Sequence, residues 1–295
     1  MADKRKGIVK YNFNNKNIII TGATGGLGSK LAHEFLKLNG NIILIGKDLN
    51  KLDALSSDLN SSKNNNQYIK TICIDLSNHN FEKDIKNLIK KIGLVDVLIN
   101  NAAIHGPIGN FWENDFDLWK EAFNVNFYSP LLLIREIVPS MISNNKGKII
   151  NISGGGATSS RPGFSSYSVS KTSLVRFTEI AADELKSYKI DVNIIAPGTM
   201  PTNLLNEVLE YKKSDISVHE INSAKKAFKT GGSLLKAVNL CVFLASDYSD
   251  GISGKLISAV WDPWNNLKKY KNKLDKSDIY NLRRIIPEDR NEKWE

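Results

Sequence analysis

Residues 17–38 read NIIITGATGGLGSKLAHEFLKL: a run of branched apolar residues, a glycine-rich turn and an amphipathic stretch. Leu31, Phe35 and Leu38 recur at helical spacing, so the pattern predicts a strand, a tight turn and a helix in that order. Glycine at positions 22, 26 and 28 permits the turn and a close backbone approach to a ligand, while the helix start offers free N–H groups and partial positive charge. The segment therefore predicts a site for the pyrophosphate of a dinucleotide.

The rest of the chain continues the alternation of β-branched runs with longer amphipathic stretches. The predicted strands are residues 17–21, 41–45, 69–74, 95–100, 148–152, 191–196 and 255–259. Strands that alternate with helices form a parallel sheet covered on both faces. Two domains would leave too few strands each, so we predict one doubly wound α/β domain of the Rossmann type with a seven-stranded parallel sheet.

Two flanking segments complete the predicted organisation. Residues 1–14 form a polar lead, residues 15–260 form the domain, and residues 261–295 form a C-terminal extension. The extension carries Trp261, Trp264 and further large apolar residues, too many for a disordered tail, so we expect it to pack on the domain. Whether it reaches a substrate pocket, or only covers apolar surface or an oligomer contact, stays open.

Composition excludes several classes of protein. The chain has 295 residues, of which 41% are hydrophobic and 24% charged, unlike fibrous or wholly disordered chains. No apolar run approaches the roughly 18 residues that span a bilayer, and the start, MADKRKGIVKYNF, lacks the apolar core of a signal peptide. Cys73 and Cys241 show neither disulfide nor zinc-site spacing. We expect a cytoplasmic protein with no membrane partner.

The net charge of +9 comes from scattered lysines and arginines, so we predict a basic surface that attracts anionic metabolites and no nucleic-acid partner. His33, His79 and His105 lack metal-ligand spacing, and His219 is predicted to lie on the surface, so no metal site is expected.

Motifs along the chain resemble, in order, those of the short-chain dehydrogenase/reductase family, over roughly residues 15–260. They are TGxxxGxG from Thr21, Asp75 after the third strand, Asn100 to Ala103 in place of NNAG, Asn126 in NVNF, YxxxK from Tyr167 and PGxxxT from Pro197. The resemblance is to oxoacyl-carrier-protein reductases or sugar and polyol dehydrogenases, with an added C-terminal extension. It implies a nicotinamide dinucleotide, a small-molecule substrate and a homodimer or homotetramer.

We predict that the cofactor contacts the glycine turn, the strand ends and the PGxxxT loop. The predicted residues are Gly22, Thr24, Gly26, Leu27, Gly28, Lys47, Asp75, Leu76, Asn101, Ala102, Ala103, Tyr167, Lys171, Pro197, Gly198 and Thr202. NADP is favoured over NAD, because Gly46 stands where an NAD site needs a carboxylate and Lys47 follows it. NAD remains the alternative cofactor because of Asp48, since a shift of one residue would bring its carboxylate toward the ribose.

Tyr167 and Lys171 are four residues apart in a stretch with helical spacing, so they share one face. A neighbouring ammonium and an oxidised nicotinamide both favour the phenolate and are expected to lower the pKa of Tyr167 from about 10. The resemblance implies that Tyr167 exchanges a proton with the substrate oxygen, that Lys171 binds the nicotinamide ribose, and that Asn126 serves a water relay. Alternatively, Asn126 only fixes a kink in its helix.

One departure from the family pattern concerns the catalytic serine. It usually lies thirteen residues before the tyrosine, which here is Gly154. Ser153 is one residue early and points to the opposite face if the strand stays in register, because side chains alternate. The flexible glycines that follow could bring Ser153 or Thr158 into place, and Ser153 is kept as a catalytic candidate.

The sequence thus predicts an NAD(P)-dependent oxidoreductase that interconverts a secondary alcohol and a ketone on a small polar metabolite. Two alternatives remain. Members of the family without the serine include reducers of activated carbon–carbon double bonds, so an enoyl or dienoyl thioester is a second substrate class. A catalytically silent dinucleotide-binding regulator is the other, although retention of Tyr167 and Lys171 argues against it.

Overall fold

The computed structural model describes residues 11–78, 81–211 and 216–294, so His79 and most of the predicted lead lie outside the described residues. Its strands are β1 (Asn17–Thr21), β2 (Asn41–Gly46), β3 (Ile69–Cys73), β4 (Val97–Asn100), β5 (Gly147–Ile152), β6 (Ile190–Ala196) and β7 (Leu256–Ser258). They form one parallel sheet in the order β3-β2-β1-β4-β5-β6-β7. The predicted doubly wound fold is confirmed, and predicted strand ends differ from observed ones by one or two residues at most.

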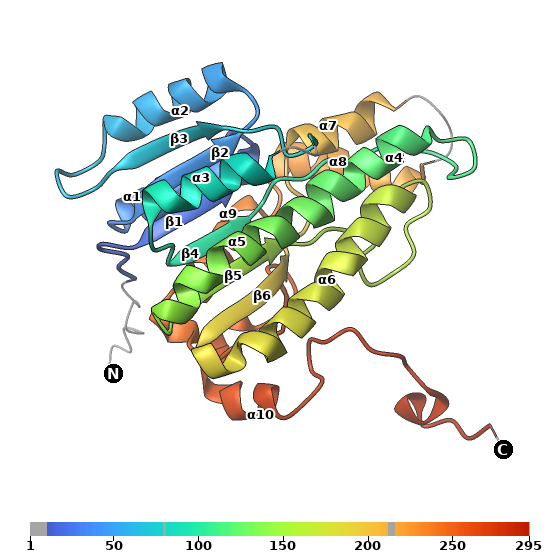
Figure 1. Cartoon of the computed structure of the whole chain (residues 1–295). Coiled ribbons are helices and arrows are strands. Elements are labelled where there is room, and N and C mark those ends of the chain that lie inside the picture. Colours follow the sequence, from blue (N-terminus) through green and yellow to red (C-terminus); the bar gives the residue numbers. More distant parts are fainter. Residues whose placement is uncertain (1–10, 79–80, 212–215, 295) are drawn as a thin grey trace, which may run out of the picture.

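Helices cover both faces of the sheet, as Figure 1 shows. The helices are α1 (Gly26–Lys37), α2 (Leu49–Asn60), α3 (Glu82–Ile92), α4 (Phe116–Phe123), α5 (Ser129–Ser143), α6 (Ser165–Leu185), α7 (Asn203–Glu210), α8 (Val218–Thr230), α9 (Leu234–Ala245) and α10 (Lys271–Asp275). The short helical turns are η1 (Asn124–Tyr128), η2 (Lys186–Tyr188), η3 (Asp247–Ser249), η4 (Trp264–Tyr270) and η5 (Pro287–Arg290). The buried side chains of α1, α2 and α9 lie on one face, and those of α3, α5 and α6 on the other.

The isoleucine runs explain why both faces need helices. Ile18 and Ile20 point into the core shared with α1 and α9, while Ile19 between them points into the core shared with α5 and α6. All three are fully buried. A strand covered on both sides reads as a continuous apolar run, and each isoleucine removed from water contributes about 1.5–3 kcal/mol.

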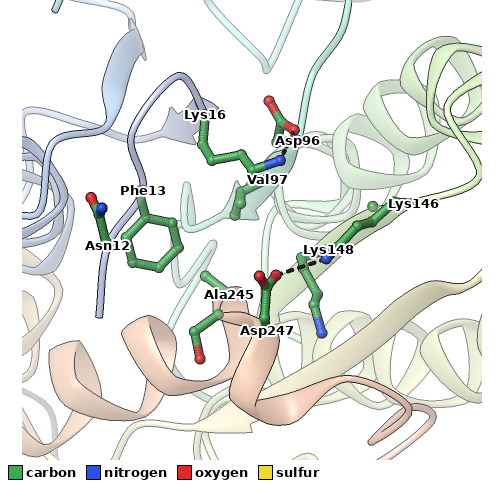
Figure 2. Close-up of a pocket in the computed structure, with 11 residues that line it drawn as sticks. Asn12, Phe13, Lys16, Asp96, Val97, Lys146, Lys148, Ala245 and Asp247 are labelled. Atoms are coloured by element: carbon green, nitrogen blue, oxygen red, sulfur yellow. Dashed lines mark hydrogen bonds and ion pairs between the residues drawn. The ribbon is translucent and has the colours of Figure 1, made fainter. Parts of the chain in front are cut away.

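Ion pairs fasten the amino ends of the strands around a small cavity of about 40 Å³ (Figure 2). Lys148 on β5 is buried and lies 2.6 Å from Asp191 on β6 and 2.8 Å from Asp250. Lys146 pairs with Asp247 at 2.8 Å. These bonds tie β5, β6 and the turn after α9 together at the edge opposite to the predicted ligand site.

The C-terminal extension runs along β7 and α6 (Figure 1). The Leu256 amide of β7 donates to the Tyr280 carbonyl at 2.8 Å, and the Leu282 amide donates to the buried Glu179 carboxylate of α6 at 2.6 Å. Trp264 packs on Phe243 of α9, with ring centres 5.7 Å apart. The extension therefore packs on the body of the protein as far as Leu282, and most of the described residues after it are exposed and lead away from the body in Figure 1.

Within the described residues, no single helix is long and apolar enough to cross a membrane, and α8 and α9 meet that requirement only as a pair bent by 81°. The same part of the chain contains no group of three or more side chains suited to hold a metal ion. Cys73 and Cys241 are both free thiols.

Candidate active site

A cavity of about 770 Å³ lies at the carboxyl ends of the strands and extends beneath α7 and α8. Every residue predicted to contact the cofactor lines this cavity except Gly28. A side chain on Gly28 would overlap the Gly22 carbonyl, so this glycine instead lets α1 pack closely against the turn that precedes it. A contact of Gly28 with the cofactor stays a prediction.

The segment after β4 fixes the conformation of the glycine turn through hydrogen bonds. The Thr21 hydroxyl accepts from the amides of Asn101 and Ala102, each at 3.0 Å, and the Asn101 side chain donates to the Thr21 carbonyl at 2.9 Å. Gly22 has a φ of 59°, and a Cβ there would lie 2.8 Å from the Ala102 Cα, so both backbone conformation and space require glycine.

The first turn of α1 fits a pyrophosphate. The helix begins at Gly26 after Gly25, a residue with no side chain to cap it, and both glycines line the cavity. The first N–H groups of a helix lack intrahelical acceptors and carry partial positive charge. Lys47 and Lys171 add cations to the same wall, so the donor set suits a nicotinamide dinucleotide.

At the end of β2 lie Lys47 and Asp48, the two side chains that favour NADP and NAD respectively in the sequence analysis. Asp48 caps α2: its carboxylate accepts from the Lys51 amide at 3.1 Å and lies 3.4 Å from the Lys51 ammonium. The hydrogen bond from the Lys51 amide holds the pKa of Asp48 below its usual value. Lys47 and Asp48 both line the cavity, and of the two only the Asp48 side chain is engaged by the start of the helix.

Tyr167 and Lys171 lie one turn apart on α6 and are 8% and 1% exposed. The Lys171 ammonium donates to the Ile152 carbonyl at 2.8 Å and lies 5.8 Å from the centre of the Tyr167 ring. Burial lowers the pKa of Lys171 to about 7. Burial also raises the pKa of Tyr167, opposed by the charge of Arg161, so the expected lowering does not occur in the protein alone.

The residue that replaces the family serine lies directly against the tyrosine. A Cβ on Gly154 would overlap the phenol oxygen of Tyr167. Ser153, although it lines the cavity, has a fully buried hydroxyl that finds no hydrogen-bond partner among the described residues. Thr158 lines the cavity as well and is exposed. The structure therefore brings Gly154 to the tyrosine and leaves the Ser153 hydroxyl inside the protein.

Asn126 lies in η1, a single π-helical turn between α4 and α5, and is fully buried. Its amide oxygen accepts from the Ile104 amide at 3.0 Å, and its amide nitrogen donates to the Ile104 carbonyl at 2.9 Å and the Ser170 hydroxyl at 3.0 Å. Both amide hydrogens are used inside the protein. The side chain holds the segment after β4 against α6, which favours the alternative of a residue that fixes local structure.

Four charged or imidazole side chains near Tyr167 were not predicted as site residues. His105 stacks edge-on against the Tyr167 ring at 5.0 Å and lies 2.9 Å from Glu207. Arg161 forms two 2.8 Å hydrogen bonds to Glu220 and covers the Phe164 ring at 3.8 Å. The position of His105 two residues after the NNAA segment is the one signal that could have drawn attention to it.

Comparisons with known proteins agree with this geometry. A family model described as short chain dehydrogenase matches residues 16–213. The chain is 31% identical over 248 residues to the 3-oxoacyl-acyl-carrier-protein reductase FabG of Rickettsia bellii, covering 83% of this chain and 95% of that protein.

Two solved structures share the fold. A structure described as a short-chain dehydrogenase of Shigella flexneri, complexed with NADP, superposes with a TM-score of 0.74 and 20% identity over 85% of this chain and 99% of that chain. An NAD⁺-bound xylitol dehydrogenase superposes with a TM-score of 0.73 and 21% identity, over 83% of this chain and 98% of that chain. The family model, the aligned relative and the fold agree: the chain belongs to the short-chain dehydrogenase/reductase family of NAD(P)-dependent oxidoreductases.

Proposed function

We propose that the protein interconverts a secondary alcohol and a ketone on a small polar metabolite, with Tyr167 as general acid and base. The observation that carries the proposal is the placement of the Tyr167 phenol and the Lys171 ammonium in one cavity with the glycine turn. A bound nicotinamide would supply or accept the hydride.

The residues of the chain would handle the proton and the orientation. In the reductive direction the Tyr167 phenol donates its proton to the substrate oxygen as the carbonyl carbon gains the hydride, and in the oxidative direction it takes the proton back. Lys171, held by the Ile152 carbonyl, presents its ammonium to the nicotinamide ribose and favours the phenolate by its charge. Asn126 acts from a distance by fixing the wall of the cavity.

The lining of the cavity beyond Tyr167 supports a polar substrate. It is formed in large part by charged, imidazole and hydroxyl side chains: His105, Arg161, Glu207, His219, Glu220 and Ser223. His105 pairs with Glu207 and Arg161 with Glu220, and the acyl chain of a thioester would exclude water from these polar pairs, which is costly in a buried site. Carbonyl–alcohol chemistry is therefore favoured over reduction of an enoyl thioester, despite the glycine at position 154.

We also infer a preference for NADP. Lys47, Asp48 and Lys51 all line the cavity where β2 ends, and the Asp48 carboxylate accepts from the Lys51 amide and pairs with the Lys51 ammonium, which leaves Lys47 as the cation of the three without an ion pair among the described residues. Cations in this place attract a 2′-phosphate, whereas an NAD site needs a carboxylate free to accept from the 2′-hydroxyl.

The experiment that tests the function measures oxidation of NADPH and NADH with a panel of small ketones and hydroxyketones, and the reverse reaction with the matching alcohols. The proposal expects turnover that disappears in Tyr167→Phe while NADPH still binds. Turnover of an enoyl thioester and of no ketone would favour the alternative substrate class.

A further inference from the structure

A second titratable pair lies beside the catalytic tyrosine. His105 follows β4, Glu207 lies on α7, and the two are separated by 102 residues in the chain. The Nδ1 of His105 and a carboxylate oxygen of Glu207 are 2.9 Å apart. His105 is 5% exposed, Glu207 is about half exposed, and both line the cavity.

Two aromatic rings fix the plane of the imidazole. The centres of the Phe164 and Tyr167 rings lie 5.3 and 5.0 Å from that of His105, both in edge-to-face contact. The main chain is fixed as well, because the Ser166 hydroxyl donates to the His105 carbonyl at 3.0 Å. The imidazole is therefore held at a set distance from the phenol.

The pairing with Glu207 decides which ring nitrogen is free. A carboxylate only accepts hydrogen bonds, so Nδ1 carries the hydrogen of this bond. Nε2 makes no hydrogen bond to any described residue, and in the neutral ring it is an acceptor. The pair thus offers an oriented acceptor in the same cavity as the proton donor of the reaction.

We propose that His105, oriented by Glu207, accepts a hydrogen bond from a substrate hydroxyl close to the reacting carbon, so that the substrate class is hydroxyketones and the corresponding diols or polyols. The inference rests on the proposed function, because the reacting oxygen is the one that meets Tyr167. His105 is then the residue that selects for the hydroxyl, and Glu207 is a positioning residue that acts through the imidazole.

The test compares two ketones that differ by one hydroxyl: acetoin, which carries it next to the carbonyl, and butanone, which lacks it. The quantity measured is the ratio of kcat/KM for acetoin to kcat/KM for butanone with NADPH. His105→Phe keeps an aromatic ring against Tyr167 but removes Nε2, and we expect it to lower the ratio about tenfold. Glu207→Gln should lower this ratio of kcat/KM values when it is introduced into the wild-type protein. It should cause no further decrease when it is combined with His105→Phe.

His33→Phe is the matched control. His33 also pairs with a carboxylate, that of Asp58 at 2.8 Å, but it lies on α1 away from the cavity and should leave the ratio unchanged. If His105→Phe lowers kcat/KM for both ketones equally, the histidine only supports Tyr167 and the proposal is overturned. The proposal is also overturned if His105→Phe leaves kcat/KM for acetoin unchanged.

A binding measurement separates this proposal from the proposed function. In saturation-transfer NMR without added cofactor, so that neither ketone can be reduced and the acetoin hydroxyl cannot be oxidised, wild-type protein and His33→Phe should bind acetoin in preference to butanone, and His105→Phe should not. A preference that survives in His105→Phe contradicts the recognition role. Absence of Tyr167-dependent turnover in the kinetic assay contradicts the proposed function instead.

Discussion

The phenol oxygen of Tyr167 occupies the space in which a side chain at Gly154 would lie. Serine at this position, as the family pattern would have it, is thus incompatible with the observed place of the tyrosine. The absence of a side chain at Gly154 thus allows Tyr167 its observed position, and the Ser153 hydroxyl does not replace the missing serine because its oxygen is buried.

Gly154→Ala should therefore lower kcat by at least about tenfold, because the added methyl group displaces the phenol from its position. Gly155→Ala is the matched control, since a Cβ there would meet only the Arg161 side chain, at ordinary contact distances of 3.6–3.7 Å. Steady-state kinetics of the two variants decide the point. Equal rates for both would show that the tyrosine can move aside at little cost.

Lys47→Ala should weaken binding of NADPH by about tenfold or more and leave NADH binding nearly unchanged, because the lysine meets a 2′-phosphate only in NADPH. Fluorescence titration of both cofactors measures the two dissociation constants. Lys30→Ala on the exposed face of α1 serves as the charge-matched control. Equal weakening of both cofactors would make Lys47 an ordinary surface charge.

Lys171 should make the stability of the ligand-free protein depend on pH. Its pKa is about 7 in the folded chain and near 10.4 when unfolded, so between these values the unfolded chain binds more protons and stability rises with pH. Lys171→Met should stabilise the protein by up to a few kcal/mol below about pH 7, with a gain that shrinks toward pH 10. Urea unfolding at several pH values measures this, and a gain independent of pH would contradict it.

The extension beyond Trp261 should matter for stability and not for substrate affinity. Among the described residues none beyond Trp261 lines the cavity, and Arg283 pairs with Asp278 and Asp289 inside the extension. Trp261, the first residue of the extension, thus reaches the cavity, whereas the later described residues of the extension do not. Residues 276–282 instead fasten the edge of the sheet.

Asn281→Ala tests that role. The Asn281 side chain accepts from the buried Lys255 ammonium at 2.6 Å and donates to the Gly254 carbonyl at 2.8 Å. Loss of these partners should cost about 1–3 kcal/mol of unfolding free energy with kcat and KM preserved. Asn265→Ala, an exposed residue of the same extension, should cost nothing measurable. If Asn281→Ala lowered substrate affinity and left stability unchanged, the extension would instead contribute to the active site.

The fold could be predicted because the relevant signals are local. Buried isoleucine runs, the turn after Thr21 and helical spacing from Tyr167 onward each specify one element, and the rule for parallel strands joins them into a sheet. The π-helical turn at Asn126 is not visible in that way, because one extra residue in a helix leaves the apolar pattern nearly intact.

The site could be predicted only in part, for the same reason. Tyr167 and Lys171 meet on one helix, so spacing suffices to place them together. His105 and Glu207 meet only because α7 folds back over the segment after β4, a relation between distant parts of the chain that no periodicity encodes. The engagement of Asp48 by the start of α2 depends likewise on a cap that becomes evident only in the structure.

The central claim is that Tyr167 transfers the proton of a carbonyl–alcohol reaction, and Tyr167→Phe tests it most directly. Phenylalanine preserves the ring that packs on His105 and removes only the exchangeable proton. The measurement is kcat for the best ketone of the panel, together with the dissociation constant for NADPH. We expect a loss of 10²–10⁴-fold in kcat with NADPH binding unchanged. A variant that keeps more than about a tenth of the wild-type rate would contradict it.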